Sequence, residues 1–210
     1  MKKVLITGGD GDIARALKNE LEYAGYFVYA PTRNEMDVTD WDSINNTMKE
    51  FVPDILVNNA GYVIPQSIKN ADLESTKRHI EVNLGGVFYC TEIALKYNSN
   101  LSIVNITSAA AIEIHATWSE YCSTKAAVVM ATKCWADDDL YAVAISPART
   151  KTKMRKNLYP DEDQTTLLEP YDFAKVLLKA VNKEYESGTH IVVRKQTVEN
   201  ILKGEINELF

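Results

Sequence analysis

The sequence predicts an α/β protein in which helices cover both faces of a doubly wound parallel sheet. Short apolar runs typical of buried strands alternate along the chain with longer segments of helical spacing. A glycine-rich turn follows the first of these strands, and residues that can carry chemistry recur where later strands end. Such sheets bind ligands beyond the carboxyl ends of their strands, so we expect the functional site there.

The individual elements follow from apolar periodicity and from residues that begin and end helices. In the first half of the chain we predict strands over 2–7, 26–30 and 54–57, and helices over 13–23 and 40–50. In the second half we predict a long helical region over 73–97, a helix carrying Tyr121 and a helix over 170–184, with strands over 101–106, 140–145 and 191–193. No break in composition divides these elements, so we expect one domain over residues 1–210.

The bulk composition excludes some classes of binding partner. The chain has 210 residues, a net charge of -6 and 46% hydrophobic residues, which is ordinary for a soluble globular protein. The acidic balance argues against nucleic-acid binding and against docking on anionic membranes. No apolar run reaches membrane-spanning length. We therefore expect a small-molecule ligand.

The three cysteines predict a cytoplasmic setting. Cys90, Cys122 and Cys134 are an odd number without metal-binding or disulfide spacing, so we interpret them as reduced thiols and expect no metal site. A strand that begins almost at Met1 leaves no room for a signal peptide.

The glycine turn predicts a nucleotide-binding site. It reads Thr7-Gly8-Gly9-Asp10-Gly11-Asp12-Ile13-Ala14, between the first strand and the first helix. There, backbone N–H groups can approach a pyrophosphate at the helix N-terminus. The alternative is that the glycines only make a tight turn. Asp10 and Asp12 would repel a pyrophosphate, so we expect them to point away or to be neutralised.

The residues after the second predicted strand favour NADP over NAD. Many nucleotide-binding folds place an acid there to bind the ribose hydroxyls, but this chain has Thr32 and the basic Arg33. A guanidinium makes bidentate, charge-assisted contacts with a 2′-phosphate. NAD stays possible, because Arg33 is alternatively a solvated loop residue.

The strongest catalytic candidates are Tyr121 and Lys125. Four positions apart on a helix, they lie on the same face and can enter one pocket. A neighbouring cation favours the phenolate and lowers the pKa of a tyrosine toward the working range. Ordinarily such a pair is solvated, so the interpretation depends on the rest of the chain.

Several further motifs resemble the short-chain dehydrogenase/reductase family, in order along nearly the whole chain. Asn58-Asn59-Ala60-Gly61 is similar to a motif of that family, and Ser108 lies thirteen residues before Tyr121 as its catalytic serine does. Asn83 and the pair Asp37-Val38 also resemble family positions, as does the segment Pro147 to Met154. The resemblance implies a compact Rossmann-type domain.

The chain departs from the family pattern at several positions. Asp12 stands where a glycine is usual, and Ala14 and Ala148 also replace glycines. Almost no chain lies between Arg33 and Asp37, where most members insert a helix. These departures indicate a trimmed member of the family.

The resemblance implies hydride transfer between a nicotinamide and a carbonyl or alcohol carbon. Tyr121 would exchange the proton and Ser108 would hydrogen-bond the substrate oxygen. Lys125 would hold the nicotinamide ribose, and Asn83 would hold a water for proton return. We expect the cofactor to contact Thr7, Gly8, Asp10, Gly11, Asp12, Ile13, Arg33, Asp37, Val38, Asn59, Ala60, Gly61, Thr107, Tyr121, Lys125, Pro147, Thr150 and Thr152.

The substrate is less well defined by the sequence. Candidate contacts are Tyr62, His115, Trp118 and Arg149, each of which has a bystander role as its alternative. Five cations within residues 149–156 would attract an anionic substrate if they face the pocket, but would otherwise form a solvated lid. We interpret His79 as a surface residue.

The leading hypothesis is an NADPH-dependent reductase of a small or sugar-like compound, with an anionic compound as one option. A nucleotide-sugar epimerase or dehydratase and a non-catalytic NADP(H) sensor are the alternatives. Since the family often pairs subunits through its central helices, we expect a homodimer or homotetramer.

Overall fold

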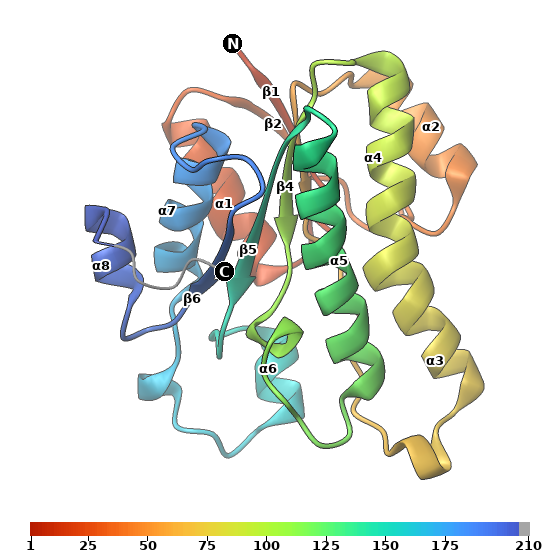
Figure 1. The fold of residues 1–210 in the computed structure, drawn as a ribbon, viewed down its shortest axis with the longest axis vertical. Helices are drawn as coiled ribbons and strands as arrows, with labels where there is room; N and C mark the ends of the chain where they lie inside the picture. The colour runs from red at the N-terminus through yellow and green to blue at the C-terminus, as the bar shows by residue number, and fades with distance from the viewer. Residues whose placement is uncertain (206–210) are drawn as a thin grey trace.

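The computed structural model describes residues 1–205 and consists of a parallel sheet between two layers of helices (Figure 1). Residues 206–210, which the predicted domain includes, lie outside the described residues. The sheet has six strands in the order β2-β1-β3-β4-β5-β6. The strands are β1 (Lys3–Ile6), β2 (Phe27–Tyr29), β3 (Ile55–Asn58), β4 (Ser102–Ile106), β5 (Tyr141–Pro147) and β6 (His190–Val193). The predicted fold class is therefore confirmed.

Eight α-helices connect and flank these strands within the described chain. They are α1 (Asp12–Tyr23), α2 (Trp41–Glu50), α3 (Leu73–Ile80), α4 (Gly86–Tyr97), α5 (Ser119–Asp137), α6 (Lys153–Leu158), α7 (Pro170–Val181) and α8 (Val198–Lys203). Helices α1, α7 and α8 pack together on one face of the sheet, and α2, α4 and α5 lie on the other (Figure 1). None of these helices is long and apolar enough to cross a membrane.

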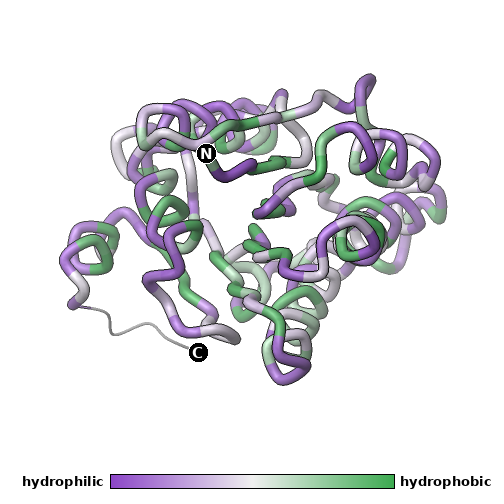
Figure 2. Tube along the Cα trace, turned by 90° about the horizontal axis from the view of Figure 1, so that it is seen from above, coloured by the Kyte–Doolittle hydropathy of each residue, from purple (hydrophilic) through white to green (hydrophobic). Residues whose placement is uncertain are grey.

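Successive side chains of each strand point to opposite faces of the sheet and form two separate cores. Val4 and Ile6 of β1 pack toward α1 and α7, whereas Leu5 between them packs toward α2 and α4. β3 repeats the pattern, since Leu56 faces the same side as Leu5. Burial on both faces is why the strands are almost entirely apolar. Seen from above, hydrophobic and hydrophilic residues alternate along the surrounding helices (Figure 2).

The strand order places a switch point between β1 and β3. From β1 the chain passes outward to β2 and then crosses back to β3 on the other side of β1. The connections after β1 and β3 therefore leave the sheet in opposite directions, which opens a crevice at their carboxyl ends. The glycine turn and Asn59 follow β1 and β3 at this point.

The predicted helical region over 73–97 is present but not uniform. A π-helical turn over Glu81–Gly85 separates α3 from α4 and contains Asn83. Such turns often occur at functional sites.

The interpretation of His79 as a surface residue is wrong. Its side chain is buried: Nδ1 is 2.8 Å from the Ser75 carbonyl oxygen, and Nε2 accepts a hydrogen bond from the Ile64 backbone. The Tyr62 ring covers it at a centroid distance of 4.7 Å. The loop after β3 buries His79, and helical periodicity alone does not place that loop.

Candidate active site

A cavity of about 430 Å³ lies at the switch point, and most of the predicted cofactor residues line it. We call it the glycine-turn cavity. The predicted residues in its wall are Gly8, Asp10, Gly11, Asp12, Ile13, Arg33, Asp37, Val38, Asn59, Ala60, Gly61, Thr107, Tyr121, Lys125, Pro147 and Thr152. Segments that are far apart in the sequence thus meet in one crevice.

Two predicted cofactor residues, Thr7 and Thr150, do not line this cavity. Thr7 is buried, and its hydroxyl accepts hydrogen bonds from the backbone N–H groups of Asn59 and Ala60, both at 2.9 Å. It therefore holds the ends of β1 and β3 together. Thr150 is also buried and donates its hydroxyl to the Ala148 carbonyl.

The glycine turn is packed too tightly for side chains at two positions. A Cβ at Gly9 would lie 2.0 Å from the Ala30 carbonyl oxygen. Gly8 has a φ of +70°, and a Cβ there would lie 3.0 Å from the Ala60 Cα. Glycine is required at both positions, since L-residues strongly disfavour that φ and nothing larger fits against the backbone. The same compactness lets a pyrophosphate approach the turn.

The expected neutralisation of Asp12 is observed. Its Oδ1 pairs with the Arg15 guanidinium at 2.6 Å, and its Oδ2 accepts a hydrogen bond from the Lys153 backbone at 2.6 Å. The carboxylate at the start of α1 is therefore compensated by groups of this chain before any phosphate approaches.

At the far end of the cavity, Arg33 lies beside Asp37. The Arg33 Nε donates to one carboxylate oxygen at 3.0 Å, and Thr39 donates its N–H and its hydroxyl to the other oxygen. Burial alone would raise the pKa of Asp37, but these hydrogen bonds and the cation lower it. Asp37 is therefore a satisfied carboxylate, while the exposed Arg33 side chain lines the cavity.

Tyr121 and Lys125 occupy the inner end of the cavity. The Lys125 Nζ lies 5.7 Å from the centroid of the Tyr121 ring and donates to the Ile106 carbonyl at 3.1 Å. The Ser108 side chain interacts with the Tyr121 phenol and acts to lower its pKa. One turn of α5 thus aligns the phenol and the amine, and the end of β4 brings in the serine.

Burial dominates the acidity of both groups. Burial raises the pKa of Tyr121 to about 12, and the opposing effect of Ser108 on this pKa is smaller. Burial lowers the pKa of Lys125 to about 8. The expectation that Lys125 lowers the pKa of Tyr121 is therefore wrong for the protein alone. A buried ammonium and a buried phenolate are both disfavoured by desolvation, which is the largest effect on each group.

Asn83, predicted at the site, is fully buried behind this end of the cavity and does not line it. Its side-chain amide exchanges two hydrogen bonds, both 2.8 Å long, with the Tyr62 backbone N–H and carbonyl. A Cβ at Gly61 would lie 3.7 Å from the Asn83 Oδ1 and 3.9 Å from the Lys125 Nζ. The π-helical turn thus fixes the loop that follows β3 beside Lys125.

A second cavity of about 610 Å³ adjoins the first and shares Pro147 with it. We call it the outer cavity. Four residues predicted at the site line it: Ser108, His115, Trp118 and Arg149. Trp118 packs edge-on against Tyr121, with the ring centroids 5.4 Å apart. The outer cavity therefore begins at the hydroxyl of Ser108 and beside the Tyr121 ring.

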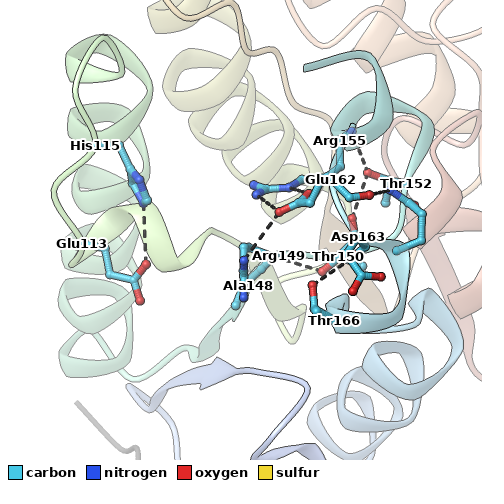
Figure 3. Close-up of polar contacts among 11 residues, drawn as sticks. Glu113, His115, Ala148, Arg149, Thr150, Thr152, Arg155, Glu162, Asp163 and Thr166 are labelled. Carbon is cyan, nitrogen blue, oxygen red and sulfur yellow. Dashed lines mark hydrogen bonds and ion pairs between the residues drawn. The ribbon is translucent and has the colours of Figure 1, made fainter. Parts of the chain in front are cut away.

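Paired charges line the outer cavity. Glu162 accepts two hydrogen bonds of 2.7 Å from Arg155 and lies 3.6 Å from Arg149, as Figure 3 shows. On the opposite wall, Glu113 pairs with Arg194 at 2.6 Å. Of the five cations within residues 149–156, only Arg149 and Arg155 line this cavity, and the two share the carboxylate of Glu162.

Some residues of the two cavities are not evident from the sequence. Tyr62, which the sequence predicts as a substrate contact, lines the glycine-turn cavity instead of the outer cavity. The Arg78 guanidinium lies 4.8 Å from the centroid of its ring. Glu162 and Glu113 lie in loops without a motif. Arg194 directly follows β6. Because ligands bind beyond the carboxyl ends of the strands, its position in the sequence could have predicted it. Other unpredicted lining residues are Met36, Val82, Ile106, Lys153, Met154 and Tyr159.

Comparison with known proteins agrees with this geometry. Residues 32–163 match the short chain dehydrogenase family. The chain is 30% identical over 170 residues to the 3-oxoacyl-acyl-carrier-protein reductase FabG of Thermotoga maritima, covering 71% of this chain and 69% of that protein. The structure resembles ligand-free aldohexose dehydrogenase of Thermoplasma acidophilum, with a TM-score of 0.83, 26% identity and coverage of 91% and 92% of the two chains. It also resembles ElxO with NADP bound, with a TM-score of 0.79, 26% identity and coverage of 92% and 96%.

These similarities define an NAD(P)-dependent oxidoreductase. The chain belongs to the short-chain dehydrogenase/reductase family.

The glycine-turn cavity fits the nicotinamide dinucleotide of this family. The glycine turn leaves backbone at its surface, and Lys125 and Tyr121 lie at the inner end of the same crevice. When bound, a nicotinamide cofactor supplies or accepts the hydride. The protein would supply the shape of the crevice, the charges that hold the phosphates and the groups that move the proton.

Proposed function

We propose that this enzyme is an NADPH-dependent reductase of a small, sugar-like carbonyl compound. The observation that carries the proposal is that Ser108 and Tyr121, which interact through their side chains, lie with Lys125 where the two cavities meet. A carbonyl oxygen in the outer cavity would accept hydrogen bonds from both hydroxyls. The Tyr121 proton would neutralise the oxygen as negative charge develops.

The assigned roles follow from position. Tyr121 is the acid in reduction and the base in oxidation. Its pKa near 12 in the protein alone suits it to hold a proton until the substrate oxygen becomes basic. Lys125 would contact the ribose of the cofactor, and Asn83 would hold the loop against which that ribose rests.

Arg33 supports the preference for NADPH. Its guanidinium lines the outermost part of the glycine-turn cavity, and Asp37 uses its Nε. The pairing also neutralises the nearest acid, which would otherwise repel a 2′-phosphate. The remaining guanidinium nitrogens are positioned to contact that phosphate.

The walls of the outer cavity favour a neutral polyhydroxylated substrate over an anion. Guanidinium–carboxylate pairs offer both donors and acceptors to hydroxyl groups. Three acids among the lining residues offset most of the charge of the four cations, which weakens the attraction for an anion. Trp118 and Tyr159, whose rings stack at 6.4 Å, offer an apolar face for the C–H side of a sugar. The resemblance to an aldohexose dehydrogenase supports the same choice.

A panel of aldoses, ketoses and their phosphorylated counterparts tests this function. We expect net oxidation of NADPH with a neutral member and no gain from the phosphate group at low ionic strength. Conversion of a substrate without net oxidation would indicate an epimerase instead. A strongly salt-dependent preference for the phosphorylated compound would contradict the assignment of a neutral substrate.

A change at Arg33 tests the cofactor preference. We expect Arg33→Ala to raise the KM for NADPH by about tenfold and to leave the KM for NADH unchanged, because one charge-assisted contact to the 2′-phosphate is lost. Lys49→Ala, which removes a cation from the last turn of α2, is the control. Equal effects of Arg33→Ala on both cofactors would refute the role.

We also propose that the chain is a single domain that acts in the cytoplasm as a homodimer or homotetramer. On α5, Val128 is buried against the sheet while Met130 is 61% exposed. An outward apolar side chain on a central helix supports pairing of subunits there.

A further inference from the structure

A single side chain connects the glycine turn to helix α6. Asp12, the first residue of α1, accepts a 2.6 Å hydrogen bond from the backbone of Lys153, the first residue of α6. Its other oxygen pairs with Arg15 at 2.6 Å. Neither the hydride transfer nor the proton transfer assigned above uses this carboxylate.

The contact lies in the wall of the glycine-turn cavity. Asp12 and Lys153 both line it, as do the neighbouring residues Gly11 and Thr152. A dinucleotide whose pyrophosphate rests on the glycine turn would therefore pass beneath this connection. The hydrogen bond thus joins two sides of the crevice, the glycine turn and the start of α6.

The far end of the α6 segment, defined as residues 149–162, is held independently. Arg155 and Glu162 form a bidentate pair within the segment, and Thr152 caps α6 by accepting from the Arg155 backbone (Figure 3). The near end is also held, because the backbone of Arg149 and Lys151 pairs with Leu168. Loss of the Asp12 contact would thus free the first turn of α6, while these bonds on either side of it persist.

We propose that Asp12 is a positioning residue that fastens the α6 segment over the bound dinucleotide and slows its release. A carboxylate accepts a stronger hydrogen bond than a neutral oxygen, which gives the connection its strength. Arg15 compensates the charge, so the carboxylate does not repel the pyrophosphate. NAD and NADP share that part of the cofactor, so the inference is independent of the proposed preference for NADPH.

Two simpler roles for Asp12 make different predictions. An acid in the first turn of a helix stabilises the helix dipole, and its loss would lower the thermal stability without changing cofactor release. An acid near phosphates weakens binding, and its loss would slow release. Only the fastening role predicts faster release when the side chain is removed.

Asp12→Ala and Asp10→Ala form a matched pair. Both remove one negative charge from the same turn, but Asp10 is exposed and offers Arg15 its backbone oxygen instead of its carboxylate. Release of NADPH from the preloaded proteins is measured by stopped-flow fluorescence. We expect release from Asp12→Ala to be about 5- to 20-fold faster than from Asp10→Ala. Asp12→Asn keeps an oxygen for Lys153 and should fall closer to the wild type.

Limited proteolysis gives a readout that needs neither cofactor nor turnover. The α6 segment contains trypsin sites after Lys151 and Lys153. We expect cofactor-free Asp12→Ala to be cleaved there several-fold faster than Asp10→Ala, with cleavage elsewhere unchanged. If Asp12→Ala does not fold, the rates of release and cleavage are compared between Asp12→Asn and Asp10→Asn. We then expect a smaller difference in the same direction. Equal rates of release and cleavage within the pair, or slower release from the Asp12 variant, would overturn the proposal.

Discussion

At the reaction centre, burial shifts the pKa values of two residues in opposite directions. Lys125 is 3% exposed and its pKa falls to about 8, whereas the pKa of Tyr121 rises to about 12. Both shifts favour uncharged side chains in the protein alone. The helical spacing predicts that the two residues meet, but their pKa values depend on which distant residues cover them, and the sequence does not show that.

The depressed pKa of Lys125 predicts a trade-off between stability and function. Between pH 8 and pH 10.5 the unfolded chain binds a proton that the folded protein does not, so below pH 8 the charged lysine destabilises the fold. We expect Lys125→Met to increase the free energy of unfolding at pH 7 by about 1–3 kcal/mol while abolishing activity. The gain should disappear as the pH rises to 10.5.

Denaturant unfolding of the cofactor-free protein across this pH range is the measurement. Lys133→Met, on the exposed face of the same helix, is the control, and it should show no comparable gain. A Lys125→Met variant that is less stable than the wild type at pH 7 would mean that the hydrogen bond to Ile106 outweighs the cost of burial.

Among the elements, the glycine turn is the least tolerant of change. A Cβ at Gly9 would lie 2.0 Å from the Ala30 carbonyl oxygen, whereas the closest contact of one at Gly11 would be 3.3 Å, to the Gly8 carbonyl oxygen. We expect Gly9→Ala to destabilise the protein by about 3 kcal/mol or more, and Gly11→Ala by clearly less. Thermal and denaturant unfolding of the two variants measure this difference in stability. Similar stabilities would show that the turn relaxes more easily than its packing indicates.

The helical elements show what periodicity can predict and what it misses. The region over 73–97 is helical as predicted, yet its π-helical turn has no signature in the apolar pattern. That turn determines where Asn83 lies, and its two bonds to Tyr62 bury His79 under the adjacent loop. Local spacing thus identifies the helix, while contacts from another segment determine its details.

For the whole molecule, the alternation of strands and helices predicts the layered sheet, and the motifs locate the crevice. Sixteen of the predicted cofactor residues line one cavity, because each follows a strand whose carboxyl end lies at the same edge. The outer cavity was predicted less fully. Its walls include Glu162 and Arg194, which meet the site only after α6 and β6 are packed, and no motif marks them.

The sheet also carries a buried titratable group whose effect is global. His190 of β6 is bonded to Ser146 at 2.7 Å, and burial lowers its pKa to about 4. As the pH falls from 6.5 to 4, the unfolded chain binds a proton that the folded protein excludes, so stability is lost in that window. We expect His190→Gln to remove up to about 3 kcal/mol of this pH dependence.

The pH dependence of unfolding, compared between His190→Gln and His115→Gln, tests this effect. His115 is 41% exposed, so its loss should leave the acid limb of the stability curve unchanged. Parallel curves for the wild type and His190→Gln would show that the folded protein can charge this histidine.

The central claim is that Tyr121 transfers the proton in an NADPH-dependent reduction. It is tested most directly by measuring kcat and the Kd for NADPH in Tyr121→Phe, with a substrate identified from the sugar panel. The hydroxyl is lost but the ring against Trp118 is retained. We predict that kcat falls by at least about a hundredfold while the Kd for NADPH and the melting temperature stay near those of the wild type. A kcat near that of the wild type would contradict the account.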